Sequence, residues 1–431
     1  MSTTFDPAVS DPARPSSPDQ VDLLHKDVLD CPHVANKVLR EQAPVWWNDK
    51  LGGFAVSRYD VIRQVIMDPA NFSNSKSQED MPIQQDKMKR MIAKFEEKGW
   101  VPARTLAGRD DPNHKQMRGL FEQAFRASRI KAMDPFVEET AYKLADDFIA
   151  AGNECDFVHA FAVPLPLIVI IKQMGGRIED MWNIKRWTDA WIKRIGRMQT
   201  EEEDLRSVEL EVEMQHYFQP VFERLRREPD DTLLSDLVNV VIPEWGRPLN
   251  DHELHAEIMS DGFGGGSETT TNALSAGVKL LIENPDAWAL LKGDPDKYMR
   301  TFIEEVLRLE SPAHTMVRIA QKDCELAGTF VPKGSVLYVR YTAGNRDEEH
   351  FLNPDKLDLE RANAATHLAF GGGVHHCMGA PLARRELYWG FKAIVDRIDD
   401  MWFIPGKNDF RHQPNFVVHA LEELHIGYKA K

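Results

Sequence analysis

Along most of the chain, apolar side chains recur with the three-to-four-residue spacing of amphipathic helices. Residues 132–151, for example, place Phe136, Leu144 and Phe148 on one helical face before Gly152. Strand-like alternation is sparser. The same patterns predict helices over 178–199, 208–227, 298–309 and 380–394, and strands over 54–56, 324–326, 335–340 and 415–419. We therefore expect a mainly α (α+β) fold with small β-sheets.

The sequence indicates one large domain after a short tail. Residues 1–20 are rich in Pro, Ser and Asp and lack the basic and apolar parts of a signal peptide, so we expect a disordered tail. Between 21 and 431 we find no internal repeat, no Gly/Ser linker and no shift in composition. Because 42% of the 431 residues are hydrophobic, we expect a single domain over 21–431 with a sizeable core.

Net charge, apolar runs and cysteine spacing limit the partners and the cellular compartment that we expect. The chain has 53 Lys and Arg against 68 Asp and Glu, and this net charge of −15 opposes binding to nucleic acid or to an anionic membrane. The densest apolar run, 161–171, is short and broken by Pro164 and Pro166, so we expect no membrane helix. The cysteines are too widely spaced for a small disulfide scaffold, which favours a reduced, cytoplasmic protein. They are Cys31, Cys155, Cys324 and Cys377.

One cysteine stands in a sequence that suits metal ligation. Residues 370–379 read FGGGVHHCMG, a glycine-rich loop just before the helix expected over 380–394. There the helix dipole and backbone N–H groups favour the thiolate of Cys377, which can serve as an axial ligand of iron. A buried cysteine without a chemical role is one alternative. Another is a zinc site built from Cys377 with His350, His367, His375 and His376.

The stretch 370–379 resembles the haem-binding signature of the cytochrome P450 family, F-G-x-G-x-H-x-C-x-G. The matching positions are Phe370, Gly371, Gly373, His375, Cys377 and Gly379. The resemblance implies a P450-like helical domain in which haem b lies between a distal helix and the cysteine loop. It also implies that Cys377 ligates the iron and that Phe370 and Gly371 lie at the haem.

Two further sets of residues fit the same family. Glu305 and Arg308 form its E-x-x-R motif, which in the family meets a later arginine, here Arg361, in a network that fixes the cysteine loop. In similar bacterial members, two basic stretches and the loop histidine hold the haem propionates, anions that need fixed donors. The corresponding residues in this sequence are His114, Arg118, Arg318 and His375.

A glycine-rich stretch interrupts a helical pattern before these motifs. Residues 260–275, SDGFGGGSETTTNALS, hold four glycines, each of which destabilises a helix by about 1 kcal/mol. The stretch is similar to the distal helix of the family, with A/G-G-x-D/E-T matched over 265–269. The resemblance implies that the helix opens beside the iron at Gly265, leaving room for dioxygen. It also implies that Thr269 and Glu268 are catalytic and supply protons.

The implied function is that of a haem-thiolate monooxygenase, which inserts one oxygen atom of O2 into a C–H bond. Because 431 residues leave no room for a fused reductase, we expect electrons from a separate ferredoxin and ferredoxin reductase. A basic patch of Lys115, Arg384 and Arg385 would suit an acidic donor, although these are equally well ordinary surface charges. We expect a monomer. The alternative is a non-catalytic haem protein that binds or senses a ligand.

The expected substrate is a small hydrophobic molecule, such as a terpenoid, steroid, fatty acid or aromatic compound. The regions that form the pocket in this family are apolar here, although each side chain would equally suit the core. Residues 71–112 are long and polar and form either a mobile lid or a surface helix. The pocket candidates are Trp100, Val101, Trp187, Trp191, Phe263, Met316, Val317, Phe416 and Val417.

Overall fold

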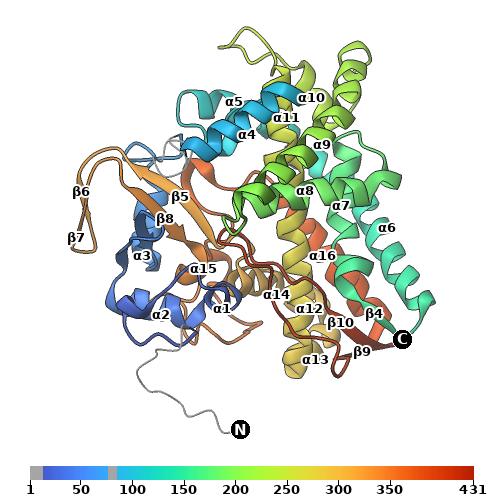
Figure 1. Cartoon of the computed structure of the whole chain (residues 1–431). Helices are drawn as coiled ribbons and strands as arrows, with labels where there is room; N and C mark the ends of the chain where they lie inside the picture. Colours follow the sequence, from blue (N-terminus) through green and yellow to red (C-terminus); the bar gives the residue numbers. More distant parts are fainter. Residues whose placement is uncertain (1–12, 76–84) are drawn as a thin grey trace.

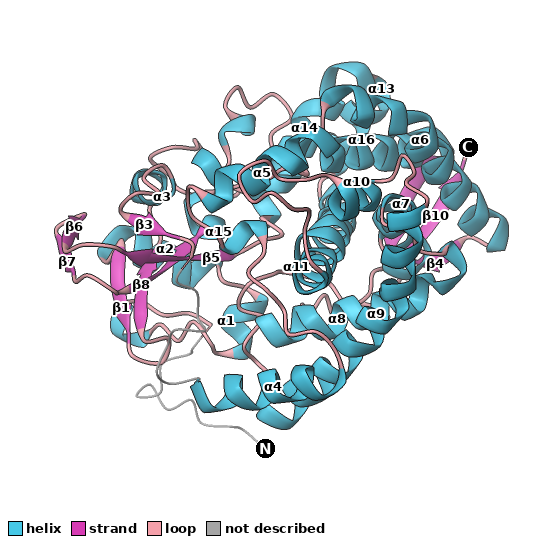
Figure 2. Ribbon diagram, turned by 90° about the horizontal axis from the view of Figure 1, so that it is seen from above, coloured by secondary structure: helices cyan, strands magenta, loops and turns pink. Residues whose placement is uncertain are grey.

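Helices make up most of the computed structural model, which describes residues 13–75 and 85–431 (Figures 1 and 2). The α-helices are α1 (Lys26–Asp30), α2 (His33–Gln42), α3 (Tyr59–Ile66), α4 (Gln85–Lys98), α5 (Asn113–Ala124), α6 (Ala127–Ala151), α7 (Pro164–Gln173), α8 (Met181–Ile195), α9 (Glu201–Arg227), α10 (Leu233–Asn239), α11 (Asp251–Glu257), α12 (Thr269–Glu283), α13 (Pro285–Gly293), α14 (Pro295–Glu310), α15 (Tyr341–Gly344) and α16 (Ala380–Arg397). A π-helix, Ile258–Glu268, joins α11 to α12. The three segments follow one another without a break.

Short strands form three small sheets. The strands are β1 (Val45–Asn48), β2 (Gly53–Val56), β3 (Phe72–Ser73), β4 (Glu154–Asp156), β5 (Thr315–Ala320), β6 (Cys324–Leu326), β7 (Thr329–Val331), β8 (Val336–Arg340), β9 (Ile398–Phe403) and β10 (His425–Ala430). Their order is β1-β2-β8-β5-β3, β4-β10-β9 and β6-β7, and only the β2–β8 pair is parallel. In Figure 2 the five-stranded sheet and the β4–β10 strands lie at opposite sides of the helices. The expected mainly α fold with small sheets is confirmed.

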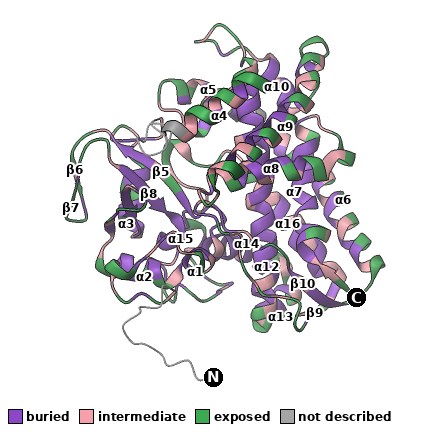
Figure 3. Cartoon of the chain, in the orientation of Figure 1, coloured by how far each residue is buried: buried purple, intermediate pink, exposed green. Residues whose placement is uncertain are grey.

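The core surrounds the helix formed by α11, the π-segment and α12. Aromatic side chains from four other helical segments are fully buried in the main hydrophobic cluster with it, and Figure 3 shows the central helices buried over most of their length. These side chains are Phe161, Phe218, Phe302 and Phe391. Burial of each of these aromatic side chains stabilises the fold by about 1.5–3 kcal/mol. The glycine-rich segment is therefore held helical by packing rather than by its own propensity.

Most expected elements occur, with displaced ends. The strands expected over 54–56, 324–326 and 335–340 match β2, β6 and β8. Helix α9 begins at Glu201, seven residues before the expected start, because Thr200 and Glu203 form a capping box. The strand expected over 415–419 is wrong. This segment is a loop, and among the described residues its single β-bridge joins Val418 to Ala313.

Two expectations about chain segments concern residues that are described only in part. Residues 1–12 of the expected tail lie outside the described residues, whereas Ser16 O accepts a hydrogen bond from Gln42 Nε2 (3.1 Å). Within the possible lid, 76–84 also lie outside the described residues, and α4 packs on α9 through Met91 and Phe95 as a surface helix. Among the helices that are described, none has the length and apolar composition needed to cross a membrane.

Candidate active site

The cysteine loop is a tight turn that only glycine can form. After a 3-10 turn at Gly373–His375, the backbone N–H of Cys377 donates to the carbonyl of Phe370 (2.9 Å), and α16 begins three residues later. Gly371 and Gly373 have φ angles of 66° and 63°, in the left-handed region that disfavours side chains. At Gly373 a Cβ would also lie 2.7 Å from the carbonyl oxygen of Ile66. The loop therefore presents Cys377 at the start of α16.

The Cys377 side chain is surrounded by protein and still reachable by solvent. Burial raises the pKa of this thiol, and the backbone N–H groups of Gly379 and Ala380 partly offset the rise. The residue is nevertheless accessible to solvent. Gly265 in the π-helix is likewise accessible, next to buried Gly264, and a Cβ there would meet only the carbonyl of Ser260, at 3.5 Å. The accessible surface at Cys377 and Gly265 leaves room for a bound group against each of them.

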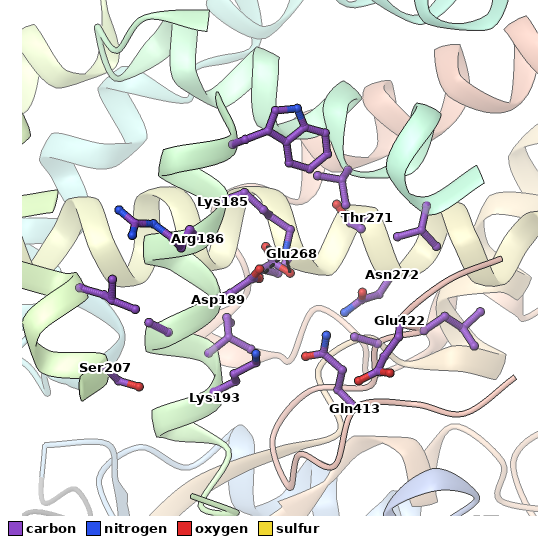
Figure 4. Close-up of a pocket in the computed structure, with 18 of the residues that line it drawn as sticks. Lys185, Arg186, Asp189, Lys193, Ser207, Glu268, Thr271, Asn272, Gln413 and Glu422 are labelled. Carbon is purple, nitrogen blue, oxygen red and sulfur yellow. Dashed lines mark hydrogen bonds and ion pairs between the residues drawn. The ribbon is translucent and has the colours of Figure 1, made fainter. Parts of the chain in front are cut away.

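The widened helix sets the direction of the two expected catalytic side chains. Thr269, the first residue of α12, is partly accessible, and its Oγ1 donates to the carbonyl of Gly265 (3.0 Å). Glu268 is buried, and its carboxylate points toward α8 (Figure 4). Consecutive helical residues diverge by about 100°. The side chains of Thr269 and Glu268 therefore point to different sides of the same helix.

Glu268 belongs to a buried charge cluster. Lys185 Nζ lies 3.2 Å from Glu268 Oε1 and also pairs with Asp189, as Figure 4 shows. Burial raises the pKa of Glu268, Asp189 raises it further, and Lys185 opposes the rise. The cluster borders a cavity of about 510 Å³ between α8, α12 and the C-terminal loop. A carboxyl group in this environment can take up and release a proton.

Four basic side chains converge beside the cysteine loop, two from α5, one from β5 and one from the loop itself. Burial lowers the pKa of His375, and together with His114, Arg318 and Arg118 it brings this pKa to about 3, so all three residues lie within electrostatic reach. The rings of His114 and His375 are 4.1 Å apart between centroids. His114 Nε2 is buried without a partner, and buried Arg318 has no carboxylate partner among the described residues. A buried basic cluster with unused donors fits anions such as the haem propionates.

Arg118 also forms hydrogen bonds to the cysteine loop, which the sequence did not indicate. Its Nη1 donates to the carbonyl of Val374 (2.7 Å) and its Nη2 to that of His376 (3.1 Å). These bonds tie α5 directly to the cysteine loop. Arg118 therefore braces the loop, and only its remaining N–H groups can contact a ligand.

The expected E-x-x-R network is present and fully buried. Arg308 Nε and Nη2 donate to the two oxygens of Glu305 at 2.6 and 3.0 Å, and Arg361 Nε lies 2.9 Å from Oε1. The Glu305 carboxylate also accepts from the backbone N–H of Asp358 (3.0 Å). Arg308 in turn donates to the carbonyl of Asn345 (3.0 Å). The network fixes the segment that leads into the cysteine loop.

The zinc alternative is not supported by the positions of the histidines. His367 Nε2 is 2.9 Å from Glu304, and His350 Nε2 is 2.9 Å from Thr366 Oγ1. In the described part of the chain, Cys377 belongs to no cluster with the spacing of a metal site.

Phe370, at the start of the cysteine loop, packs against Arg384, whose guanidinium carbon lies 4.6 Å from the centroid of the Phe370 ring.

Several pocket candidates belong to the hydrophobic core. Trp187, Phe263 and Phe416 are buried, as the alternative interpretation allowed. Two acidic residues that the sequence analysis did not single out lie closer to the site. Glu257 accepts from the backbone N–H of Leu106 (2.7 Å), and Asp261 accepts from that of Ala107 (3.2 Å). Their i,i+4 spacing on one helix face was the available signal.

Comparison with known proteins agrees with this geometry. The Cytochrome P450 family model matches residues 297–399, which include the E-x-x-R network and the cysteine loop. Cytochrome P450 107B1 of Saccharopolyspora erythraea is 30% identical over 380 residues, covering 87% of this chain and 89% of the relative. The chain belongs to the cytochrome P450 family.

Two further similarities place this cytochrome P450 among bacterial members. The steroid C26-monooxygenase of Mycobacterium tuberculosis is 30% identical over 395 residues, covering 91% of this chain and 93% of the relative. The solved structure of cytochrome P450 CREJ, in complex with (4-ethylphenyl) dihydrogen phosphate, matches with a TM-score of 0.82 and 25% identity over 92% of this chain and 97% of the other. The chain is thus a P450 monooxygenase, an oxidoreductase, and its family carries a haem iron. These findings confirm the enzyme prediction over the ligand sensor.

Proposed function

We propose that this P450 holds haem b through Cys377 and inserts one oxygen atom of O2 into a C–H bond of a small hydrophobic molecule. The observation that carries the proposal is the accessible Cys377 thiol surrounded by protein, within electrostatic reach of Asp261 on the π-helix that contains Gly265. The basic cluster beside it offers His114, Arg318 and His375 as partners for the propionates. When bound, the haem iron activates dioxygen with electrons from outside.

The residues of the central helix control protons in this proposal. The Thr269 hydroxyl donates to Gly265 O on a partly accessible face of the helix, and by turning away from that carbonyl it can donate to a small ligand instead. Glu268 is buried with a raised pKa, so it can carry a proton between the cavity beside α8 and the helix. Lys185 keeps the carboxylate oriented when it is ionised. General acid groups of this kind contribute about 10²–10⁴-fold to proton transfer.

Removing the hydroxyl tests these proton roles. Thr269→Ala should bind substrate normally but release more hydrogen peroxide and less product per NAD(P)H. Ser275→Ala is a matched control, because its hydroxyl also donates to the carbonyl four residues earlier, in the buried part of α12. Unchanged product per NAD(P)H in Thr269→Ala would remove the assigned role, whereas an equal loss in Ser275→Ala would point to helix damage.

We propose the substrate class from the side chains that pack against the π-helix and from the reaction named for one relative. Apolar side chains lie against the glycines of the π-helix: Trp191 of α8 packs so close to Gly264 that a Cβ there would lie 2.5 Å from its ring, and Ile170 of α7 lies 3.3 Å from a Cβ at Gly266. One relative is a steroid C26-monooxygenase. We therefore place a steroid-sized hydrophobic molecule first among the terpenoid, steroid, fatty acid and aromatic classes. A spin-state titration of the haem protein against all four classes tests this order, and a response confined to fatty acids would overturn it.

The proposed electron donor is a ferredoxin that docks near the cysteine loop. Arg384 and Arg385 contribute little to a docking patch, because Arg384 pairs with Glu304 and Arg385 with Asp134. Lys115 on α5 is exposed. We expect Lys115→Glu to slow reduction by an acidic ferredoxin and to weaken its salt dependence. Lys322→Glu, beside the projecting β6–β7 hairpin in Figure 1, should change neither, and equal effects of the two variants would refute docking at α5.

A further inference from the structure

A second cluster of metal-ligating side chains lies where three chain segments meet. Glu310 is the last residue of α14, and His412 and His419 stand in the loop between β9 and β10. One ligand atom from each of these side chains lies within 4.8 Å of the other two. None of the three belongs to the proposed haem site. The cluster therefore needs an explanation of its own.

Backbone hydrogen bonds hold this loop against the turn that follows α14. The N–H of His419 donates to the carbonyl of Pro312 (3.0 Å), and that of His314 donates to the carbonyl of Val417 (2.7 Å). On the other side, Asp30 at the end of α1 accepts from the backbone N–H of His412 (2.8 Å). The three ligand side chains are thus brought together by fixed backbone rather than by flexible surface chains.

Asp30 settles which ring nitrogens are free. His419 Nε2 is 3.0 Å from the carbonyl oxygen of Asp30, and because a carbonyl only accepts, this nitrogen carries the hydrogen. His412 Nδ1 is 3.0 Å from Asp30 Oδ1 and donates in the same way. The lone pairs therefore lie on His419 Nδ1 and His412 Nε2. Histidines that bind metals usually donate their other N–H to a carboxylate or a backbone carbonyl, as both do here.

The free nitrogen of His419 faces a carboxylate. His419 Nδ1 lies 3.9 Å from Glu310 Oε2, and the two side chains are only 5% and 16% exposed. A ring nitrogen lone pair and a carboxylate oxygen are both acceptors, so they repel each other unless a proton or a metal ion lies between them. The pair is therefore incomplete as it stands, in a place with little access to water.

We propose that Glu310, His412 and His419 bind a divalent transition-metal ion, for which Zn²⁺ is the best match, with water as the fourth ligand. Imidazole nitrogen and carboxylate oxygen are both common zinc ligands, at about 2.0–2.2 Å. Because the site joins α14 to the C-terminal loop, the ion has a structural role. The same loop reaches α8 through Asn415, whose Nδ2 donates to the carbonyl of Ile192 (2.9 Å).

Coordination requires a modest rearrangement of the two rings. In the structure the His412 and His419 rings stack, with centroids 3.5 Å apart and planes at 14°. Parallel rings direct their lone pairs side by side, so the rings have to open relative to each other to converge on one ion. Tetrahedral zinc needs its ligand atoms about 3.4 Å apart. One ring nitrogen of each histidine and a Glu310 oxygen now lie within 4.8 Å of one another, so the three side chains have to draw closer to bind one ion.

Zinc binding to the haem-loaded enzyme tests the proposal. After treatment with a chelator, the untagged protein is dialysed against Zn²⁺ and the bound metal is measured by atomic absorption. We expect one Zn²⁺ per chain and a rise in the melting temperature with Zn²⁺ concentration. Glu310→Gln and His419→Gln should each weaken binding at least tenfold and abolish that rise. His425→Gln is the control, because it removes a histidine beside Glu423 in the same part of the chain and should change neither readout.

Two results would overturn the proposal. One is a wild-type protein that retains no Zn²⁺ under these conditions. The other is a Glu310→Gln variant that binds Zn²⁺ as tightly as the wild type, which would place the ion elsewhere. Glu310 is partly accessible, so its variant decides the matter if His419→Gln fails to fold. The carbon monoxide difference spectrum verifies that haem ligation is intact in every variant compared.

Discussion

Replacing Glu305 with Gln perturbs the most deeply buried charge network of the described structure. The carboxylate accepts two hydrogen bonds from Arg308 and one from the backbone of Asp358, and it faces Arg361. Both Glu305 and Arg308 have side chains that are 0% exposed. Breaking a buried pair by removing one partner destabilises a protein by about 3–5 kcal/mol, since a charge is left unpaired. With typical stabilities of about 5–15 kcal/mol, this is a large part of the total.

Urea unfolding of the haem-loaded protein measures this effect. We expect Glu305→Gln to lower the free energy of unfolding by about 4 kcal/mol and to reduce haem retention. Glu283→Gln is the matched control, because Glu283 pairs with Lys279 at i,i+4 on the surface, where such a pair contributes about 0.3–0.5 kcal/mol. A loss below about 1 kcal/mol for Glu305→Gln, similar to the control, would refute the idea that this network holds the segment before the cysteine loop.

Three further predictions concern the surroundings of the cysteine loop. Burial alone would raise the pKa of Glu304, but hydrogen bonds from buried His367 and half-buried Arg384 lower it to about 2. The resulting stabilisation of roughly 3 kcal/mol is present above about pH 4.5 and lost toward pH 2, and Glu304→Gln should flatten this part of the stability curve. Arg318→Leu should speed haem transfer to apomyoglobin several-fold, and an unchanged rate would remove it from the propionate site. Gly373→Ala should destabilise by more than 1 kcal/mol in urea unfolding, whereas Gly293→Ala, with open space around it, should not; equal effects would contradict the steric argument.

The helical fold was predictable because it depends on local patterns. Strands such as β6 and β8 follow alternation and turn residues, and α16 follows its apolar spacing. The segment 415–419 has the same alternation but pairs through only one bridge, since hydrogen bonds from Asn415 and to Pro312 hold it as a loop. Such tertiary pairing leaves no signal in the pattern of one segment.

The site was predictable where residue types are fixed by spacing. The cysteine loop, Glu305 with Arg308, and the Glu268–Thr269 pair all stand in short motifs. Other features depend on segments that are far apart in sequence. They are the hydrogen bonds from Arg118 to the cysteine loop, the pairing of Lys185 with Glu268 and the open space beside Gly265. These features could be found only once the folded structure had brought the segments together.

The central claim is that Cys377 is the iron ligand, and the carbon monoxide difference spectrum of the reduced protein tests it most directly. The wild type should show a band near about 450 nm, the wavelength that gives the family its name. Cys377→Ala should lose this band, while Cys155→Ala, whose thiol pKa is raised to about 12 by burial, should keep it. A full band near about 450 nm in Cys377→Ala would contradict the account.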